Sequence, residues 1–381
     1  MSMARTKYLS TDASHAAQAS RFQLLQYARF RYTMPTPDQV RGRLFPYSAL
    51  TSVSWIVLIV PSRPEIATVL ATGCSGFLGR HCLEALVRHG FRVHAVSRSF
   101  RSDAVDEIIW HNLDLQSRGP AEQLIATLRP SHLLHLAWVT TPDVYRYANE
   151  NLDWLEASLA LVRSFGEHGG RRFVGVGSSA EYDVAAGPCR EDDTPIRPVS
   201  VYGQCKAALW MATQAYAQRY GFSAAWGRVF LPYGPGDEPH RLIPSLLAEL
   251  TAGTPINVTD GRQIRDFVCA ADVAELLARL LATPKASGAY NIGTGRGVAV
   301  RQVIEWVADH FHARQLVHFG VHPRRDDEPS SLVADMAKIE HVLGWHSPTS
   351  IESGLEQLVL KMEASSPASS RWRGGVGSCA S

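Results

Sequence analysis

A glycine-rich turn constrains the fold of this chain more than any other stretch of its sequence. An apolar run at 66–70 leads into the turn, and apolar residues at helical spacing follow it at 80–86. The turn itself reads Thr72-Gly73-Cys74-Ser75-Gly76-Phe77-Leu78-Gly79. In a strand–turn–helix unit the first glycine permits the tight turn, the second admits a pyrophosphate, and the third lets the helix pack on the strand. Because the helix N-terminus also offers free N–H groups, the stretch predicts a nucleotide-phosphate site, although glycines alone also fit an ordinary strand-to-helix turn.

From residue 65 onward the sequence alternates apolar strands with amphipathic helices. The expected strands are 68–71, 92–97, 133–137, 172–177 and 224–230. The expected helices between them are 80–89, 120–128, 151–168 and 202–220. This alternation is typical of an α/β protein whose parallel, doubly wound sheet is covered by helices on both faces. Since such sheets bind ligands beyond the carboxyl ends of their strands, residues at those ends are the candidate site residues.

The domain organisation follows from where this alternation starts and weakens. Residues 1–64 do not fit it and form an N-terminal extension that we expect to be poorly ordered; a transit peptide and a start codon assigned too far upstream are alternatives. Residues 65–233 form the expected nucleotide-binding domain. Residues 234–362 form a smaller mixed α/β lobe, with the chain returning to the sheet. The tail at 363–381, rich in Ser, Gly and Arg, is expected to be disordered.

The composition is that of a globular protein and argues against several functional classes. Of the 381 residues, 45% are hydrophobic and 19% charged, with a net charge of +2, so no charge excess favours nucleic acid or an anionic membrane as a partner. The apolar run at 55–60 is too short to span a bilayer, which takes about 20 residues. Because the six cysteines form no CxxC pair, we expect no metal site and buried free thiols, as in the reducing cytoplasm.

The end of the second strand bears on the choice of cofactor. An acidic residue there would bind the ribose 2′-hydroxyl of NAD, but Ser97 and Arg98 stand in its place, which suits the 2′-phosphate of NADP. NADP is therefore favoured, with Arg80 and Arg101 available to add positive charge. The alternative is that Arg98 is a solvated loop residue and the cofactor is NAD. Asp114, where a third strand should end, is either a ligand of the adenine amino group or an ordinary turn residue.

A tyrosine and a lysine four residues apart carry the strongest chemical signal. They lie in the segment Tyr202-Gly203-Gln204-Cys205-Lys206 of a predicted helix, so their side chains share one face. A nearby ammonium lowers the pKa of a phenol and makes it a usable acid or base near neutral pH. Upstream, the strand-end residue Ser178 offers a hydroxyl to the same substrate oxygen, and a helix or turn cap is its alternative role.

Taken together, these motifs resemble those of the extended short-chain dehydrogenase/reductases, and among them the NAD-dependent epimerase/dehydratase family that acts on nucleotide sugars. The resemblance covers most of the chain between the two tails, and its motifs occur in the family's order. Beyond the glycine turn and the Tyr–Lys pair they are Leu134-His135-Leu136-Ala137, Ser178-Ser179, Tyr233-Gly234-Pro235-Gly236, Arg265-Asp266-Phe267-Val268, Asp272-Val273-Ala274, Tyr290-Asn291-Ile292-Gly293 and Leu343-Gly344-Trp345. It implies a Rossmann-type sheet with a smaller C-terminal substrate lobe, and a homodimer.

The resemblance also implies roles for single residues. Tyr202 is the expected general acid/base, Lys206 its electrostatic partner and a ligand of the cofactor ribose, and Ser178 the group that orients the reacting hydroxyl or ketone. Ser178 is preferred to Ser179 because it keeps the family's spacing to Tyr182. The other expected cofactor contacts are Gly73, Ser75, Gly76, Phe77, Leu78, Gly79, Arg98, Asp114, Leu115, Leu136, Ala137 and Trp138.

The expected substrate-binding residues are Ser179, Arg265 and Arg325. Arg265 and the pair Arg324-Arg325 resemble the family's arginines for the diphosphate of the nucleotide sugar, and a guanidinium fork can hold two phosphate oxygens at once. For this pair, a surface salt-bridge cluster with the acidic residues 326–328 is the alternative.

One departure from the family narrows the expected reaction. Sugar 4,6-dehydratases typically follow the active-site serine with acidic residues, whereas here Ser179 and Ala180 follow and Glu181 comes late, which argues against dehydration. The expected function is NAD(P)-dependent reduction of a 4-keto-6-deoxy nucleotide sugar, or the reverse dehydrogenation. The alternatives are a nucleotide-sugar 4-epimerase with tightly bound NAD and a non-catalytic NADP-binding sensor or scaffold. The expected partner is a nucleotide-diphosphate sugar, with no role for nucleic acid or membrane.

Overall fold

A seven-stranded parallel sheet forms the centre of the fold. The computed structural model describes residues 66–99, 107–117, 119–142, 144–183 and 187–365, and within these the strand order is β11-β6-β5-β4-β1-β2-β3. The strands are β1 Thr68–Thr72, β2 Arg92–Ser97, β3 Ile108–Asn112, β4 His132–His135, β5 Arg172–Ser178, β6 Ser223–Val229 and β11 Gly288–Ile292. The chain runs outward from β1 in both directions, which confirms the predicted α/β doubly wound sheet.

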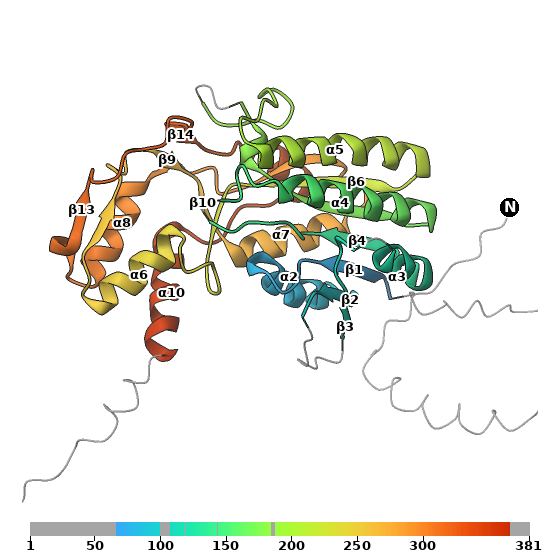
Figure 1. Cartoon of the computed structure of the whole chain (residues 1–381), viewed down its shortest axis with the longest axis horizontal. Coiled ribbons are helices and arrows are strands. Elements are labelled where there is room, and N and C mark those ends of the chain that lie inside the picture. The colour runs from blue at the N-terminus through green and yellow to red at the C-terminus, as the bar shows by residue number, and fades with distance from the viewer. Residues whose placement is uncertain (1–65, 100–106, 118, 143, 184–186, 366–381) are drawn as a thin grey trace, which may run out of the picture. The chain divides into compact units, whose positions relative to one another are not determined.

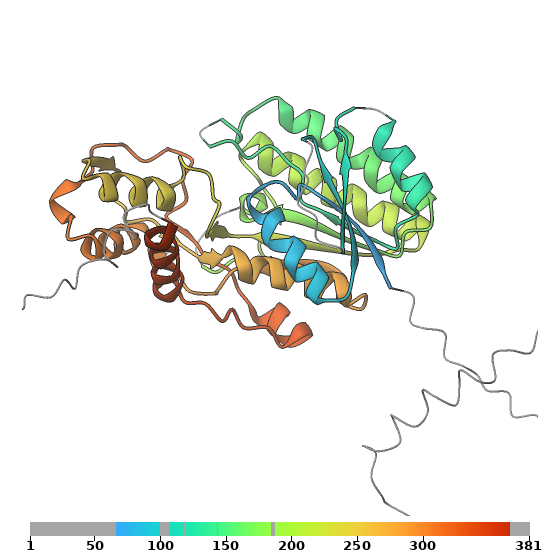
Figure 2. The same cartoon turned by 90° about the horizontal axis from the view of Figure 1, so that it is seen from below.

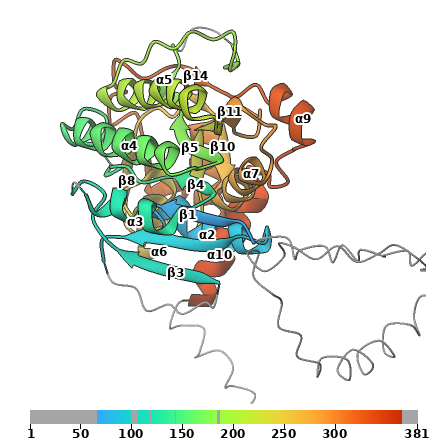
Figure 3. The same ribbon diagram turned by 90° about the vertical axis from the view of Figure 1, so that its right-hand side faces the viewer.

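Helices cover both faces of the sheet, as Figure 3 shows. On one face α2 and α7 pack together, burying Leu86 and Leu280 against the strands. On the other face α3, α4 and α5 lie side by side, and their residues Ile125, Leu161 and Leu209 are buried in the core. The helix bounds are α2 Phe77–Arg88, α3 Pro120–Leu128, α4 Glu150–Glu167, α5 Val201–Tyr220 and α7 Ala270–Ala282. Burial on both faces explains why the strands read as continuous apolar runs.

The residues after Gly234 form a second part of the structure, which we call the second layer, and it has a hydrophobic core of its own. It contains α6, α8 and α10 with the parallel pair β8 and β13, and these lie together beside the sheet in Figures 1 and 2. Its buried residues include Leu246, Val303 and Leu355. The bounds are α6 Leu242–Ala252, β8 Ile256–Val258, α8 Val300–His310, β13 Val317–Phe319 and α10 Ile351–Ser365. Between these elements the chain returns to the sheet through α7 and β11.

Short elements join the two layers. The remaining strands are β7 Leu231–Tyr233, β9 Ile264–Arg265, β10 Phe267–Cys269, β12 Val298–Ala299 and β14 Ser331–Leu332. Helix α9 is Ala337–Leu343, and two 3₁₀ turns are Ser179–Glu181 and Arg314–Leu316. β14 and β12 flank β9, so the segment that carries Arg265 is held from both sides.

Element boundaries differ from the predicted ones where a side chain or a turn decides them. Helix α2 begins at Phe77, not at 80, because Gly76 is extended (φ −78°, ψ 177°) and immediately precedes the first helical turn. The strand expected at 133–137 ends at His135, and Leu136 and Ala137 continue from it as loop. Strand β3 had no predicted bounds. Its residues are half-buried or exposed, so β3 lacks the continuous apolar run of a fully buried strand. The expected extension at 1–64 and the expected tail lie outside the described residues, apart from residues 363–365 in α10.

Among the described residues, no helix combines the length and the apolar character needed to cross a membrane.

Candidate active site

A cavity of about 960 Å³ opens at the carboxyl ends of the strands and extends to the second layer. Residues after β1, β2, β3, β4 and β5 line it, together with the start of α5 and segments around β9 and β14. Of the expected site residues, those that line it are Gly73, Ser75, Gly76, Phe77, Leu78, Gly79, Arg98, Leu115, Leu136, Ala137, Trp138, Ser178, Ser179, Tyr202, Lys206, Arg265 and Arg325.

The glycine turn is built as a cradle that larger residues would fill. Gly73 has a positive φ of 73°, and a Cβ there would lie 2.6 Å from the Ala137 nitrogen. A Cβ on Gly79 would lie 2.1 Å from the Gly73 carbonyl oxygen, so the helix could not pack on the turn. The first turn of α2 has neither a side-chain cap nor an acidic residue, so its N–H groups and dipole remain available to an anion at the cavity wall. The residues present therefore fit a dinucleotide pyrophosphate.

A buried histidine fixes the next wall of the cavity. The Thr72 hydroxyl and His135 Nδ1 are 2.7 Å apart, and His135 Nε2 lies 2.8 Å from the Ser158 hydroxyl on α4. Burial lowers the pKa of His135 to about 3, so the ring is neutral and serves as a structural link between β1, β4 and α4. Trp138 is held in turn by its Nε1–H, which donates to Asn151 Oδ1 at 2.8 Å.

The side-chain amide of Asn112 holds the backbone at the end of β2. The two residues at this strand end, Ser97 and Arg98, are not acidic. The Asn112 side-chain amide, oriented to satisfy its hydrogen bonds, donates to the Ser97 carbonyl at 3.3 Å and to the Arg98 carbonyl at 2.7 Å. Arg98 is exposed at the cavity edge. Asp114 caps a local turn by accepting the Gln116 N–H at 3.1 Å, while its neighbour Leu115 lines the cavity. Arg101 lies outside the described residues.

Ser178, Tyr202 and Lys206 meet at the inner end of the cavity. Ser178 ends β5 and caps the 3₁₀ turn, accepting the Ala180 N–H at 3.1 Å, and its hydroxyl acts to lower the pKa of the neighbouring Tyr202 phenol. Ser200 caps α5 by accepting the Gly203 N–H at 3.1 Å, which places Tyr202 in the first turn of the helix. Ser178 thus combines the capping role and the contact with the tyrosine, which the sequence had posed as alternatives.

Lys206 is buried one turn further along α5. Its ammonium donates to the Val176 carbonyl at 2.8 Å and lies 4.0 Å from the centre of the Trp138 ring. The distance from the ammonium to the centre of the Tyr202 ring is 5.9 Å. Burial lowers the pKa of Lys206 to about 7, against a smaller opposing effect of Glu181. The lysine is therefore poised to change charge near neutral pH.

Burial, and not the lysine, dominates the ionisation of Tyr202. Desolvation raises the pKa of its phenol, and the neighbouring Tyr145 adds to this, while the hydrogen bond from Ser178 and the charge of Arg241 act in the opposite direction. The expectation that the phenol's pKa would be lowered is wrong for this structure, because the tyrosine is almost fully buried. The neutral phenol is favoured and can donate a proton, whereas accepting a proton requires its phenolate form.

Glu181, the acidic residue three positions after Ser178, is not among the residues that line the cavity. Its side chain is fully buried behind β5 and forms an ion pair with Arg228 at 2.9 Å. Tyr182, the next residue, donates its hydroxyl to Asn291 Oδ1 at 2.6 Å. A carboxylate held in this way cannot deliver a proton to a sugar in the cavity, which agrees with the argument against dehydration.

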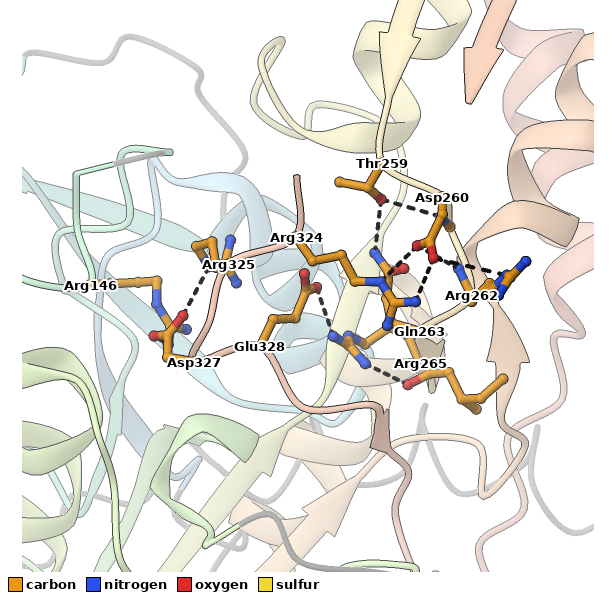
Figure 4. A network of polar contacts seen from close by, with 12 residues as sticks. Arg146, Thr259, Asp260, Arg262, Gln263, Arg265, Arg324, Arg325, Asp327 and Glu328 are labelled. Carbon is orange, nitrogen blue, oxygen red and sulfur yellow. Dashed lines mark hydrogen bonds and ion pairs between the residues drawn. The ribbon is translucent and has the colours of Figure 1, made fainter. Parts of the chain in front are cut away.

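Arginines and carboxylates alternate at the outer end of the cavity, as Figure 4 shows. Arg265 Nη2 donates to Glu328 Oε1 at 2.7 Å, and both side chains are largely buried. Arg325 Nε lies 3.3 Å from Asp327 Oδ1. Arg324 instead makes two bonds, of 2.7 and 2.6 Å, with Asp260. Arg265 and Arg325 thus line the cavity, whereas Arg324 is engaged within the second layer.

Four residues that line the cavity near Tyr202 and Arg325 had no role assigned to them from the sequence. The Tyr145 ring meets the Tyr202 ring edge-on, with centres 5.0 Å apart. Arg146 donates to Asp327 at 2.7 Å, and Arg241 lies 3.4 Å from Asp237. Burial raises the pKa of Asp237 to about 6. These residues stand in the loop after β4 and the segment before α6, where the sequence carries no periodic signal that would place them.

Comparison with known proteins agrees with this geometry. The model of the NAD dependent epimerase/dehydratase family matches residues 69–293, from β1 to just beyond β11. UDP-glucose 4-epimerase 4 of Oryza sativa subsp. japonica is 25% identical over 333 residues, covering 75% of this chain and 87% of that protein. dTDP-glucose 4,6-dehydratase of Xanthomonas campestris pv. campestris is 26% identical over 331 residues, covering 77% and 92%.

A solved structure shows the same fold with ligands. MoeE5 in complex with UDP-glucose and NAD is 30% identical to this chain, with a TM-score of 0.70 over 78% of this chain and 99% of that one. The match confirms the resemblance to the extended short-chain dehydrogenase/reductases. The chain described here belongs to the NAD dependent epimerase/dehydratase family.

Proposed function

We propose that the protein is a nucleotide-sugar 4-epimerase that works with a retained nicotinamide dinucleotide. The observation that carries this proposal is the convergence of Ser178, Tyr202 and Lys206 on the cavity that also contains the glycine turn. The burial of Glu181 in an ion pair argues against a dehydratase. The similarity to a UDP-glucose 4-epimerase supports epimerisation as the reaction, and the NAD bound in MoeE5 supports NAD as the retained cofactor.

The residues of this chain then have defined tasks. NAD, when bound, supplies the hydride acceptor and donor. In its phenolate form Tyr202 would take the proton of the sugar C4 hydroxyl as hydride leaves C4, and as a phenol it would return the proton to the C4 oxygen when hydride returns to the other face of the 4-keto sugar. Ser178 would hydrogen-bond the same oxygen, and the Lys206 ammonium, 5.9 Å from the centre of the Tyr202 ring, would favour the phenolate form of Tyr202.

The outer end of the cavity suits the diphosphate of the substrate. Arg265 and Arg325 line it and offer planar guanidinium groups to phosphate oxygens. Glu328 and Asp327 hold these groups in place. We assign Ser179, at the start of the 3₁₀ turn, to the sugar itself, since it follows Ser178 along the cavity wall.

The test uses purified protein and no added cofactor. UDP-glucose and UDP-galactose are incubated with the protein, and inversion at C4 is followed by proton NMR. Interconversion that Tyr202→Phe abolishes supports the proposal. Absence of interconversion across a panel of UDP- and dTDP-hexoses and hexuronic acids would overturn it.

Net reduction of a 4-keto nucleotide sugar is the second candidate, and Arg98 is the observation that favours it. A positive side chain in the place of an acidic one suits NADP, a cofactor commonly consumed in reductions. Stoichiometric NADPH oxidation by a 4-keto sugar, with no epimerase activity, would establish this reaction instead.

Two properties of the whole protein belong to the same proposal. Leu152 on α4 and Met211 on α5 are exposed by 58% and 69%, which supports a homodimer formed through these helices. The described cysteines are free thiols, and four of the five are buried, which supports a reducing compartment such as the cytoplasm.

A further inference from the structure

A buried carboxylate lies directly behind the reacting serine and is not used by the proposed mechanism. Glu181 has no exposed surface. Its Oε2 accepts the Arg228 Nε–H at 2.9 Å, and its Oε1 accepts the Trp226 Nε1–H at 2.9 Å. A buried ion pair of this kind adds little to stability compared with an apolar pair, so its presence calls for another explanation.

The same carboxylate holds the backbone of the serine. Glu181 Oε1 also accepts the Ser178 N–H at 2.8 Å, and this hydrogen bond closes the 3₁₀ turn. Gly177 makes this possible: a Cβ there would lie 2.1 Å from Trp226 Nε1 and 2.4 Å from Glu181 Oε1. The end of β5 is thus shaped so that the carboxylate can reach the amide of Ser178.

The charge of Glu181 also acts on α5. It acts on the pKa of Arg228 from β6 and on those of Lys206 and Tyr202 from α5, and His135 from β4 also faces Lys206. Burial lowers the pKa of Lys206, and Glu181 acts against this by favouring the ammonium. Glu181 therefore acts on Ser178 through a hydrogen bond and on Lys206 through its negative charge.

We propose that Glu181 is a positioning residue of the active site, whose buried charge, held by Arg228 and Trp226, fixes Ser178 and sustains the ammonium of Lys206. This inference rests on the proposed function, because it takes Ser178 and Lys206 as catalytic. Arg228 has the complementary part of neutralising the carboxylate without competing for the Ser178 amide.

The main variant removes both charges of the pair. Glu181→Gln alone leaves Arg228 buried without a counter-charge and can fail to fold. The double variant Glu181→Gln/Arg228→Met leaves no unpaired charge, so it should fold. We expect kcat for C4 epimerisation to fall about 10- to 100-fold with KM nearly unchanged, because the serine is misplaced while the outer cavity is intact.

The pH profile distinguishes positioning from a purely structural role. Loss of the Glu181 charge lowers the pKa of Lys206 further, so the alkaline limb of kcat should move to lower pH by about one unit. The matched control is Arg172→Met, at the opposite end of β5, where the fully buried guanidinium donates to Ala286 O and Ser223 Oγ at 2.8 and 2.7 Å. This control should lose stability yet keep the wild-type pH profile.

A readout independent of turnover follows the lysine itself. The chain has few lysines, namely Lys7, Lys206, Lys285, Lys338 and Lys361. An NMR titration of lysine-labelled protein, with the Lys206 signal assigned by its loss in Lys206→Met, should show a lower Lys206 pKa in the double variant than in wild type.

The outcomes separate the two proposals. A double variant with wild-type kcat, pH profile and Lys206 titration refutes the role of Glu181, even if Tyr202→Phe is inactive. Full activity of Ser178→Ala and Lys206→Met refutes the proposed catalytic function. The inference about Lys206 would then be decided by the NMR titration, in which an unchanged pKa contradicts it.

Discussion

Replacing Lys206 by methionine should stabilise the cofactor-free protein while abolishing its activity. The ammonium is almost fully buried, and burial lowers its pKa from 10.5 to about 7. One pKa unit corresponds to about 1.4 kcal/mol, so keeping this lysine charged costs the fold up to about 5 kcal/mol. The hydrogen bond to Val176 and the contact with Trp138 are lost with the ammonium, and methionine fills most of the same volume. A net gain of about 2–3 kcal/mol is therefore expected.

The stabilisation by Lys206→Met should depend on pH in a direction that follows from the lowered pKa of Lys206. Below pH 7 the lysine is protonated in both the folded and the unfolded state, so the full cost is present. Between about 7 and 10.5 the unfolded chain binds a proton that the folded chain lacks, and wild-type stability therefore rises with pH. The advantage of Lys206→Met should be largest at pH 6, vanish near pH 9, and turn into a loss of about 1–2 kcal/mol by pH 10.

Urea unfolding at pH 6, 8 and 10 measures this advantage, with equal m-values showing that the same surface is exposed. Lys338→Met is the control, because Lys338 pairs with Asp192 at the surface and its loss should give no gain that depends on pH in this way. A Lys206→Met protein that is no more stable than wild type at pH 6, or whose advantage grows with pH, would refute the argument from burial.

Three further predictions concern the cofactor and substrate ends of the cavity. Gly79→Ala places a Cβ 2.1 Å from the Gly73 oxygen, so we expect a loss of about 1–3 kcal/mol in thermal unfolding and weaker NAD binding by calorimetry. Arg98→Glu should shift the ratio of the NADP and NAD dissociation constants towards NAD by at least about tenfold, and an unchanged ratio would show that Arg98 does not contact the ribose. Arg265→Gln should raise KM for the nucleotide sugar at least about tenfold with a smaller change in kcat, whereas an unchanged KM would remove Arg265 from the diphosphate site.

Local spacing made much of the fold and the inner site predictable. The glycine turn and the pair Tyr202 and Lys206 are fixed by residues close in sequence, and a parallel sheet necessarily gathers its strand ends at one edge. The sequence therefore placed these groups on one cavity without any knowledge of long-range contacts.

Contacts between distant segments were not predictable in the same way. Arg228 pairs with Glu181 across 47 positions, and Arg146 pairs with Asp327 across 181. No periodicity links such positions, so only the packed structure shows which arginine finds which carboxylate. The sign of the Tyr202 pKa shift was mistaken for a related reason, because sequence spacing reveals a neighbouring ammonium but not the depth of burial.

The central claim is that this chain exchanges the two C4 epimers of a nucleotide sugar by transient oxidation. The most direct measurement adds UDP-glucose deuterated at C4 to purified protein without added cofactor and follows NADH absorbance at 340 nm together with the C4 configuration by NMR. The account predicts a transient NADH signal and UDP-galactose that retains deuterium at C4, both lost in Tyr202→Phe. Epimer formation with loss of the C4 label to solvent, or turnover with no dependence on Tyr202, would contradict it.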